Sequence, residues 1–162
     1  MKGLGRSDSG TVRGGDWDQR VVPFDTHPKV VACAQRFEQG VSWEASGIVL
    51  YMRERLHTEV HPDGYRDLDE VLDRYRALDR LFEHLRSGGA FMTRRQLMGR
   101  RAFREQGGVY VHVDRHARPI FGHGGYHRLA VARLLGLPSI PAQLGVVHSA
   151  ALRTWRARYC DP

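Results

Sequence analysis

The sequence predicts an α+β fold, because helical patterns fill its first half and strand patterns appear in its second half. Apolar residues recur at steps of three and four over 68–85, the period of a helix that buries one face. The run Val109-Tyr110-Val111-His112-Val113 is mostly β-branched or aromatic and is typical of a strand. After it, turn residues separate segments in the order strand, strand, helix, strand, helix.

Two helices are expected early in the chain. The first covers 28–39, with Thr26 as its N-cap and Gly40 just past its end. The second covers 43–56 and has Ser42 as its N-cap, although a glycine inside this segment lowers its helix propensity. In both segments the apolar residues are spaced so that one face of the helix can be buried.

The clearest helix starts at Asp67, whose carboxylate can accept from the free amides of the first turn. Glu70 completes an Asp-x-x-Glu capping box, and Ser87-Gly88-Gly89 ends the helix. The opposite face is charged, as expected for a surface in contact with water. The apolar face carries Leu68, Val71, Leu72, Tyr75, Leu78, Leu81, Phe82 and Leu85.

The second half contains shorter elements. A strand over 109–113 should pass through a hairpin loop at 114–119 into a second strand that starts at Ile120-Phe121. The elements expected after it are a helix over 126–135, a third strand over 139–144 and an Arg-rich helix over 150–159.

The chain has 162 residues, the size of one ordinary domain or of one domain with a small appendage. Residues 1–15 are rich in Gly, Ser and Arg and are expected to be a flexible lead. Residues 16–106 should form a helical extension, and residues 107–162 a strand-containing core that carries the last helix. Trp17 stands between two carboxylates and should dock on the body of the protein, because its ring favours cover.

Composition argues against several classes of protein. No apolar run approaches the roughly 20 residues that a membrane-spanning helix needs, and residues 1–15 lack the apolar segment of a signal peptide. Cys33 and Cys160 are far apart in sequence and cannot make a disulfide framework or a paired-cysteine metal site. We therefore expect a cytoplasmic protein with no membrane partner.

The net charge is +7, from 25 Lys and Arg against 18 Asp and Glu, and the lysines are Lys2 and Lys29 alone. Guanidinium groups present forked donors that suit phosphate and carboxylate, so the many arginines favour an anionic partner. A genome rich in G and C would produce the same bias without any function.

One segment has the pattern of a phosphate site: Phe121-Gly122-His123-Gly124-Gly125-Tyr126-His127-Arg128, which joins a strand to a helix. Glycines let the backbone approach a ligand, and the free amides that open the following helix favour an anion. His127 and Arg128 lie in the first helical turn and can donate charge-assisted hydrogen bonds. The pattern is neither GxGxxG nor the Walker motif. The alternative is a tight turn with Arg128 in a surface ion pair.

Residues 120–144, IFGHGGYHRLAVARLLGLPSIPAQL, resemble the core of the ParB/sulfiredoxin fold. That core has a strand ending in a Gly-rich turn, a His-Arg or Arg-Arg pair that opens a helix, a Gly-Leu helix exit and an Ile-Pro-Ala strand. Residues 109–119 match the strand that commonly precedes it. With residues 14–18 and the segment RFEQGVSWE, the chain is similar to an uncharacterised ParB-like group that has a helical N-terminal extension.

The resemblance implies a β-α-β core with a nucleotide pocket. In sulfiredoxins the matching turn binds ATP phosphates, in ParB proteins CTP, and in related free-serine kinases ADP or ATP. It implies that Gly124, Gly125, His127 and Arg128 contact phosphates, with Mg²⁺ held by the nucleotide.

The same resemblance limits the activity. Sulfiredoxins place their catalytic cysteine where this chain has Tyr126, so sulfiredoxin chemistry is not expected. Residues 145–162 are too few for the DNA-binding domain that follows this core in partition proteins, so a complete partition protein is not expected either.

We therefore expect a nucleotide-binding protein, with phosphoryl transfer from ATP or ADP to a small-molecule acceptor as the candidate reaction. Such transfer needs a base for the acceptor hydroxyl. Glu105, before the first strand, and Asp114, at its exit, are the candidate catalytic carboxylates. The alternatives are a solvated residue for Glu105 and a turn residue for Asp114.

A nucleic-acid-binding accessory protein is the alternative function. Arginines in two segments would form its surface, with Trp155 and Tyr159 interleaved on the last helix. These arginines are Arg94, Arg95, Arg100, Arg101, Arg104, Arg153, Arg156 and Arg158. A third alternative is a non-catalytic interaction module that has kept the fold.

Histidine spacing resembles a metal site only superficially. His112 and His116 are four apart, as are His123 and His127, with His148 downstream. The first pair spans a strand end and a loop, and no carboxylate or cysteine completes a zinc pattern. We expect no bound transition metal.

Overall fold

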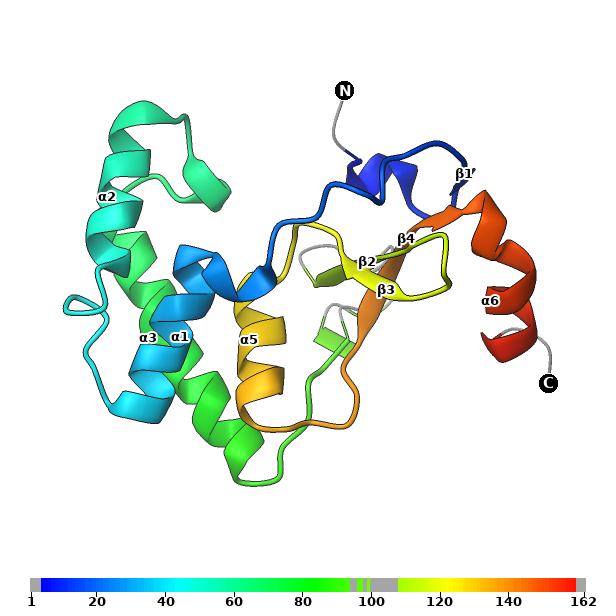
Figure 1. Ribbon diagram of the computed structural model, residues 1–162. Coiled ribbons are helices and arrows are strands. Elements are labelled where there is room, and N and C mark those ends of the chain that lie inside the picture. The colour runs from blue at the N-terminus through cyan, green and yellow to red at the C-terminus, as the bar shows by residue number, and fades with distance from the viewer. Residues whose placement is uncertain (1–3, 94–95, 98, 100–107, 160–162) are drawn as a thin grey trace. The chain divides into compact units, whose positions relative to one another are not determined.

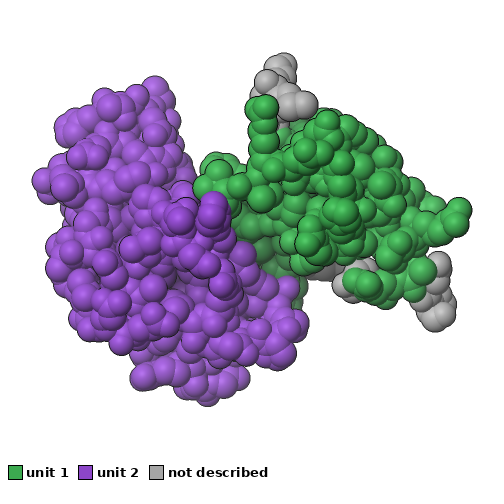
Figure 2. Space-filling view, in the orientation of Figure 1, with its two compact units in different colours: residues 1–22, 92–125, 141–162 green, residues 23–91, 126–140 purple. Residues whose placement is uncertain are grey.

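The structure is a computed structural model that describes residues 4–93, 96–97, 99 and 108–159. The chain divides into two compact units (Figure 2). Unit 1 comprises residues 1–22, 92–125 and 141–162, and unit 2 comprises residues 23–91 and 126–140. Strands lie in unit 1 and most of the helices in unit 2, which confirms the α+β class predicted from the sequence.

Unit 1 contains a four-stranded mixed sheet in the order β1-β4-β2-β3 (Figure 1). β4 runs parallel to both β1 and β2, and β3 pairs antiparallel with β2. The three strands expected from the sequence are present, although β4 begins and ends later than predicted. The strands are β1 (Val12–Arg13), β2 (Val109–Val113), β3 (Pro119–Phe121) and β4 (Ala142–His148).

Strand β4 carries a bulge opposite His112. Val111 pairs with Leu144, whereas Val113 pairs with Val147, so two residues of β4 face one residue of β2. One of the two is Gly145, where a Cβ atom would lie 2.5 Å from Nδ1 of His112. The bulge and its glycine therefore make room for the imidazole ring.

The two faces of the sheet are covered differently. On one face, Val113 and Val147 pack with Ala151 and Trp155 from the C-terminal elements η5 (Ser149–Ala151) and α6 (Leu152–Tyr159). Because side chains alternate along a strand, Tyr110 and His112 point to the opposite face.

Residues 5–13 of the N-terminal segment contact the sheet on that side, and for these described residues this differs from the flexible lead expected over 1–15. The helix η1 (Arg6–Asp8) precedes β1, whose pairing with β4 extends the sheet. The amide of Gly10 donates to Gly145 O at 2.9 Å, and the Tyr110 hydroxyl donates to Gly5 O at 2.7 Å. These bonds to the sheet satisfy backbone groups that a free tail would leave to water.

Trp17 docks as predicted. Its ring lies against two histidines of the sheet, with ring centroids 5.6 Å from His112 and 5.9 Å from His148. The neighbouring Asp18 is buried and binds Arg115 of the β2-β3 hairpin loop, with Oδ1 2.7 Å from Nη2.

Unit 2 is helical, with a core formed by side chains such as Cys33, Ile48, Met52 and Leu78. The helix α5 follows β3 and precedes β4 in sequence but packs within this unit, so the units cut across the predicted segments 16–106 and 107–162. Its elements are η2 (Phe24–Thr26), α1 (Pro28–Gln39), α2 (Ile48–Thr58), η3 (Pro62–Gly64), α3 (Leu68–Arg86) and α5 (Tyr126–Leu134).

Helix ends follow local chemistry. Helix α1 has the predicted bounds and ends at Gly40 with a left-handed φ of 72°, although His27, and not Thr26, is its N-cap. Helix α2 starts later than predicted, because Gly47 adopts a φ of 78° that an α-helix cannot contain. Asp67 caps α3 as predicted, accepting from the amide of Glu70 at 2.9 Å.

Within the part of the chain that the structure describes, no helix combines the length and apolar character needed to cross a membrane.

Candidate functional site

The glycine-rich turn after β3 belongs to unit 1 as far as Gly125 and is tied closely to β2. The amide of Gly122 donates to Tyr110 O at 2.6 Å, and the amide of Tyr110 donates to Gly124 O at 3.3 Å. A Cβ atom at Gly122 would lie 2.7 Å from His112 Nε2, and one at Gly125 would lie 2.7 Å from the Val109 backbone. Packing against β2 thus requires glycine at positions 122 and 125 of the turn.

Positive φ angles make this turn compact. Gly125 has a φ of 80°, and the exposed His123 has a φ of 46°, which is uncommon for a residue with a side chain. The turn therefore has the tight backbone that the sequence predicted, and Gly124 is the glycine that faces a charged group.

That charged group is the Arg6 guanidinium. A Cβ atom at Gly124 would lie 2.8 Å from Arg6 Nη2. Arg6 donates from Nη1 to Gln143 Oε1 at 2.7 Å and from Nη2 to Gly108 O at 2.5 Å, and it lies over the Tyr110 ring, 5.3 Å from the centroid. Burial lowers the pKa of Arg6, yet arginine starts so high that the group stays charged near neutral pH. The turn thus has a fixed cation beside it.

Sequence reasoning missed Arg6. It stands alone in a Gly/Ser/Arg-rich stretch, and its partners Gly108 and Gln143 are more than 100 residues away in the chain. No spacing rule connects positions so distant, so only the pairing of β1 with β4 could have indicated it.

His127 lies in the core of unit 2. It is 9% exposed, and its Nε2 lies 3.3 Å from the Tyr75 hydroxyl. Burial lowers its pKa to about 3, and the nearby charges of Arg74 and Lys29 add to this effect. The imidazole is therefore neutral at pH 7, which differs from the charged phosphate donor expected from the sequence.

The residues on either side of His127 also have partners within unit 2. The ring of Tyr126 stacks on His27 with centroids 3.8 Å apart. The guanidinium carbon of Arg128 lies 4.8 Å from the centroid of the Phe91 ring. Gly122, His123, Gly124 and Gly125 thus belong to unit 1, and Tyr126, His127 and Arg128 to unit 2.

Asp114 forms the hairpin loop between β2 and β3. Its Oδ1 accepts from the amides of His116 and Arg118, both at 2.8 Å, and its Oδ2 accepts from Arg118 Nε at 2.9 Å. Burial by itself would raise its pKa, but these hydrogen bonds outweigh burial and hold the pKa below its usual value. Its contacts are those of a turn residue. Glu105 lies outside the described residues, and the catalytic role of either carboxylate stays a prediction.

Two histidines of unit 1, His112 and His148, make hydrogen bonds that support the fold. Nδ1 of His112 accepts from the amide of Val146 at 2.9 Å, and burial lowers the pKa of the ring. His148 accepts from the amide of Ala150 at 3.1 Å and donates through Nε2 to Gly15 O at 2.9 Å. In the described ranges, no three His, Cys, Asp or Glu side chains gather in a group that could hold a metal ion.

The arginines proposed for nucleic acid divide between described and masked positions. Arg153, Arg156 and Arg158 of helix α6 are exposed, while Trp155 is half-buried and packs against the core of unit 1. The other predicted positions, Arg94, Arg95, Arg100, Arg101 and Arg104, lie outside the described residues.

The charge of the protein is concentrated in unit 1. Its segments contain 14 Lys and Arg against 6 Asp and Glu, a net charge of +8, whereas unit 2 contains 11 against 12, a net charge of −1. A concentrated positive charge attracts polyanions and raises their rate of association. The excess positive charge of the chain therefore lies in unit 1.

Comparisons with models of protein families, with curated proteins and with solved structures find no match for this chain.

Proposed function

We propose that unit 1 binds the phosphate groups of a nucleotide at the glycine-rich turn, with Arg6 as the principal cation. The observation that carries this proposal is the Arg6 guanidinium held against Gly124 by Gln143 and Gly108. The positive charge of this guanidinium, held beside the turn, would attract phosphate oxygens. Since its position is fixed before binding, little conformational entropy is lost when an anion arrives.

The order of elements supports a ParB/sulfiredoxin-like core. Strand β2, strand β3, helix α5 and strand β4 follow one another, and β4 pairs parallel with β2. The glycine-rich turn falls between β3 and α5, the position in which the ParB/sulfiredoxin fold holds nucleotide phosphates. ATP, ADP and CTP are therefore the ligands to test.

The proposal is one of binding. Phosphoryl transfer to a small acceptor would require a base, and the oxygens of Asp114 are bonded to Arg118 and His116. Mg²⁺ would be held by the nucleotide's own phosphates, since it commonly keeps several waters and needs few protein ligands.

Thermal unfolding with each nucleotide, with and without Mg²⁺, tests the proposal. A ligand that binds the folded state raises the melting temperature, by an amount equivalent to about 2.7 kcal/mol at 100 times its dissociation constant. We expect ATP, ADP or CTP to raise the melting temperature of the wild type and Arg6→Gln to remove the rise. Arg20→Gln, an exposed change in the same unit, should keep it.

The outcome that contradicts the proposal is a wild type whose melting temperature no nucleotide changes. An Arg6→Gln variant that responds as the wild type does would contradict the role of Arg6. Circular dichroism of Arg6→Gln, alongside Arg6→Lys, shows whether a lost response reflects lost folding, because Lys keeps the positive charge.

Nucleic-acid binding is the second candidate, and the net charge of +8 on unit 1 favours it. Helix α6 contains three exposed arginines and no acidic residue. Exposed arginines on one helix can contact phosphate groups without reading the base sequence. Binding that weakens steeply with salt is the expected behaviour.

A further inference from the structure

The ring of His112 has one nitrogen without a hydrogen-bond partner. The residue is 6% exposed, and its Nδ1 accepts from the amide of Val146 at 2.9 Å. Its Nε2 has no partner within the described parts of the chain. The fully enclosed atoms without a partner in those parts do not include Nε2, so this nitrogen keeps contact with solvent. Polar atoms of buried residues nearly always have a partner, so Nε2 needs an explanation.

The bond to Val146 determines which kind of partner Nε2 requires. A neutral imidazole has one donor nitrogen and one acceptor nitrogen. Because Nδ1 accepts from an amide, Nε2 carries the proton and is the donor. Burial lowers the pKa of His112, although the nearby Asp8 opposes this effect, so the ring is neutral at pH 7. The missing partner is therefore a hydrogen-bond acceptor, such as an anionic oxygen, and a cation does not fit.

This donor lies beside the glycine-rich turn. A Cβ atom at Gly122 would lie 2.7 Å from Nε2, and one at Gly145 would lie 2.5 Å from Nδ1. The ring thus has a glycine next to each nitrogen. At Gly122, the absence of a side chain leaves Nε2 uncovered on the side of the turn.

The donor also lies near the Arg6 guanidinium. Both groups contact the Tyr110 ring, His112 with ring centroids 4.8 Å apart and the guanidinium carbon of Arg6 at 5.3 Å from the centroid. His112 borders Gly122, and Arg6 borders Gly124. These two glycines are two residues apart, so their Cα atoms are separated by at most about 7 Å. A ligand with linked phosphates that lies along the turn can therefore contact both groups.

We propose that His112 is a second phosphate-binding residue of the turn, which donates from Nε2 to an oxygen of the same phosphate chain that Arg6 attracts. The inference rests on the proposed function, because it adds a donor to the same site. A neutral donor contributes a directed hydrogen bond without the cost of burying a second cation.

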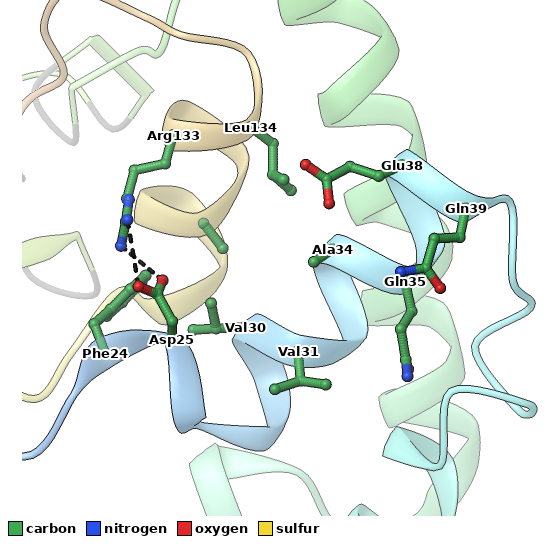
Figure 3. A pocket seen from close by; sticks show the side chains of 11 residues that line it. Phe24, Asp25, Val30, Val31, Ala34, Gln35, Glu38, Gln39, Arg133 and Leu134 are labelled. Atoms are coloured by element: carbon green, nitrogen blue, oxygen red, sulfur yellow. Dashed lines mark hydrogen bonds and ion pairs between the residues drawn. The ribbon is translucent and has the colours of Figure 1, made fainter.

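The groove of unit 2 does not suit a phosphate and supplies a control. It lies between α1 and α5 and has a volume of about 540 Å³ (Figure 3). The cation that lines it, Arg133, donates from Nη1 to Asp25 Oδ1 at 2.7 Å, and Figure 3 draws this pair. The carboxylate of Glu38 also lines the groove and would repel an anion. Arg133→Gln is therefore expected to leave nucleotide binding unchanged.

Long-range nitrogen-proton spectra of the histidine rings test the proposal in the full chain. These spectra show which nitrogen of each imidazole carries the proton. ATP, ADP and CTP are titrated in turn, and we expect a nucleotide that raises the melting temperature also to shift the Nε2 resonance of His112. His148 is the internal control, because its Nε2 already donates to Gly15 O at 2.9 Å and should not shift.

Two variants separate the donor from the fold. His112→Asn keeps an acceptor near the position of Nδ1 but has no donor near that of Nε2. It should weaken nucleotide binding about tenfold, the size expected for one hydrogen bond to a charged group. His112→Gln can place its amide nitrogen near the position of Nε2 and should bind more tightly than His112→Asn.

Three results would overturn the proposal. The first is a wild-type His112 that carries its proton on Nδ1. The second is a nucleotide that raises the melting temperature but shifts Nε2 of His112 no more than that of His148, which would leave the proposed function standing without His112. The third is no response to any nucleotide, which would contradict the proposed function as well. If His112→Asn does not fold, the wild-type spectra still decide between these results.

Discussion

Nε2 of His127 lies 3.3 Å from the hydroxyl oxygen of Tyr75, and both side chains are buried in unit 2. The two rings meet edge to face with centroids 5.2 Å apart. Burial raises the pKa of the tyrosine and lowers that of the histidine to about 3, so both groups are neutral at pH 7. Residue 127 thus connects the first turn of α5 to the middle of α3.

This relationship predicts a loss of stability in mild acid. An unfolded histidine titrates near 6.5, whereas His127 in the folded state does so near 3. Between these values the unfolded chain binds a proton that the folded chain does not, so the free energy of unfolding falls as the pH falls from about 6.5. The upper limit of the loss is about 4–5 kcal/mol over the whole window.

Urea unfolding at several pH values measures this loss. We expect His127→Gln to lower stability at pH 7 and to flatten the pH dependence between about 6.5 and 4.5. His57→Gln, an exposed change on α2, is the control and should keep the wild-type slope. A wild-type slope in His127→Gln would contradict the prediction.

A second prediction concerns Gly125. Gly125→Ala places a Cβ atom 2.7 Å from the backbone of Val109 at a φ of 80°. Backbone atoms cannot move aside as a flexible side chain can, so we expect a loss of at least about 2 kcal/mol in the free energy of unfolding.

Gly10→Ala is the matched control, because Gly10 has a φ of 76° with no atom within 4 Å of an added Cβ. Gly10→Ala should lower the free energy of unfolding by only about 1 kcal/mol, because alanine is strained in the left-handed conformation. Chemical denaturation of the two variants gives the difference. Equal losses would show that the contact with Val109 is unimportant.

A third prediction concerns the docking of the N-terminal segment. Asp18 accepts from Arg115 Nε and from the Arg115 amide, both at 2.9 Å, and these bonds hold its pKa far below the usual value. Asp18→Asn should lower the free energy of unfolding by about 1–3 kcal/mol, because a buried charged acceptor is replaced.

Asp16→Asn is the control for Asp18→Asn. Asp16 also contacts Arg115, at 3.0 Å, but it is exposed, so its loss should cost well under 1 kcal/mol. Protection of the Arg115 amide from hydrogen exchange should fall in Asp18→Asn and stay unchanged in Asp16→Asn. Loss of protection in both variants would assign the docking to both carboxylates.

The sequence predicted well those elements that are determined by residues within the element itself. Helix α3 has a capping aspartate and an unbroken apolar stripe, and β2 is a run of β-branched and aromatic residues, so both were predicted with nearly the observed bounds. Helix α2 was predicted to begin too early, since the left-handed Gly47 sets its start.

Long-range pairing could not be predicted in the same way. Strand β1 has two residues, and its partner Val147 is far along the chain, so its formation depends on the edge of β4 and not on its own propensity. The position of Arg6 depends on that pairing. For the same reason, the sequence pattern Gly-Tyr-His-Arg indicated a charged His127, whereas His127 is neutralised by burial in the core of unit 2, where its partner Tyr75 lies 52 residues away in the chain.

The last prediction tests nucleic-acid binding by helix α6. The triple change of Arg153, Arg156 and Arg158 to Gln removes three positive charges from exposed positions of the helix and keeps helix propensity nearly constant. If the three groups contact phosphates of duplex DNA, the slope of log K against log salt should become shallower by about 2–3, since each contact contributes about 0.9.

The matched control changes Arg76, Arg80 and Arg86 of α3, which removes the same charge from unit 2. Fluorescence anisotropy with a labelled duplex at several salt concentrations gives both slopes. Equal slopes for the two triple variants would exclude α6 as the contact surface, because net charge alone would then account for binding.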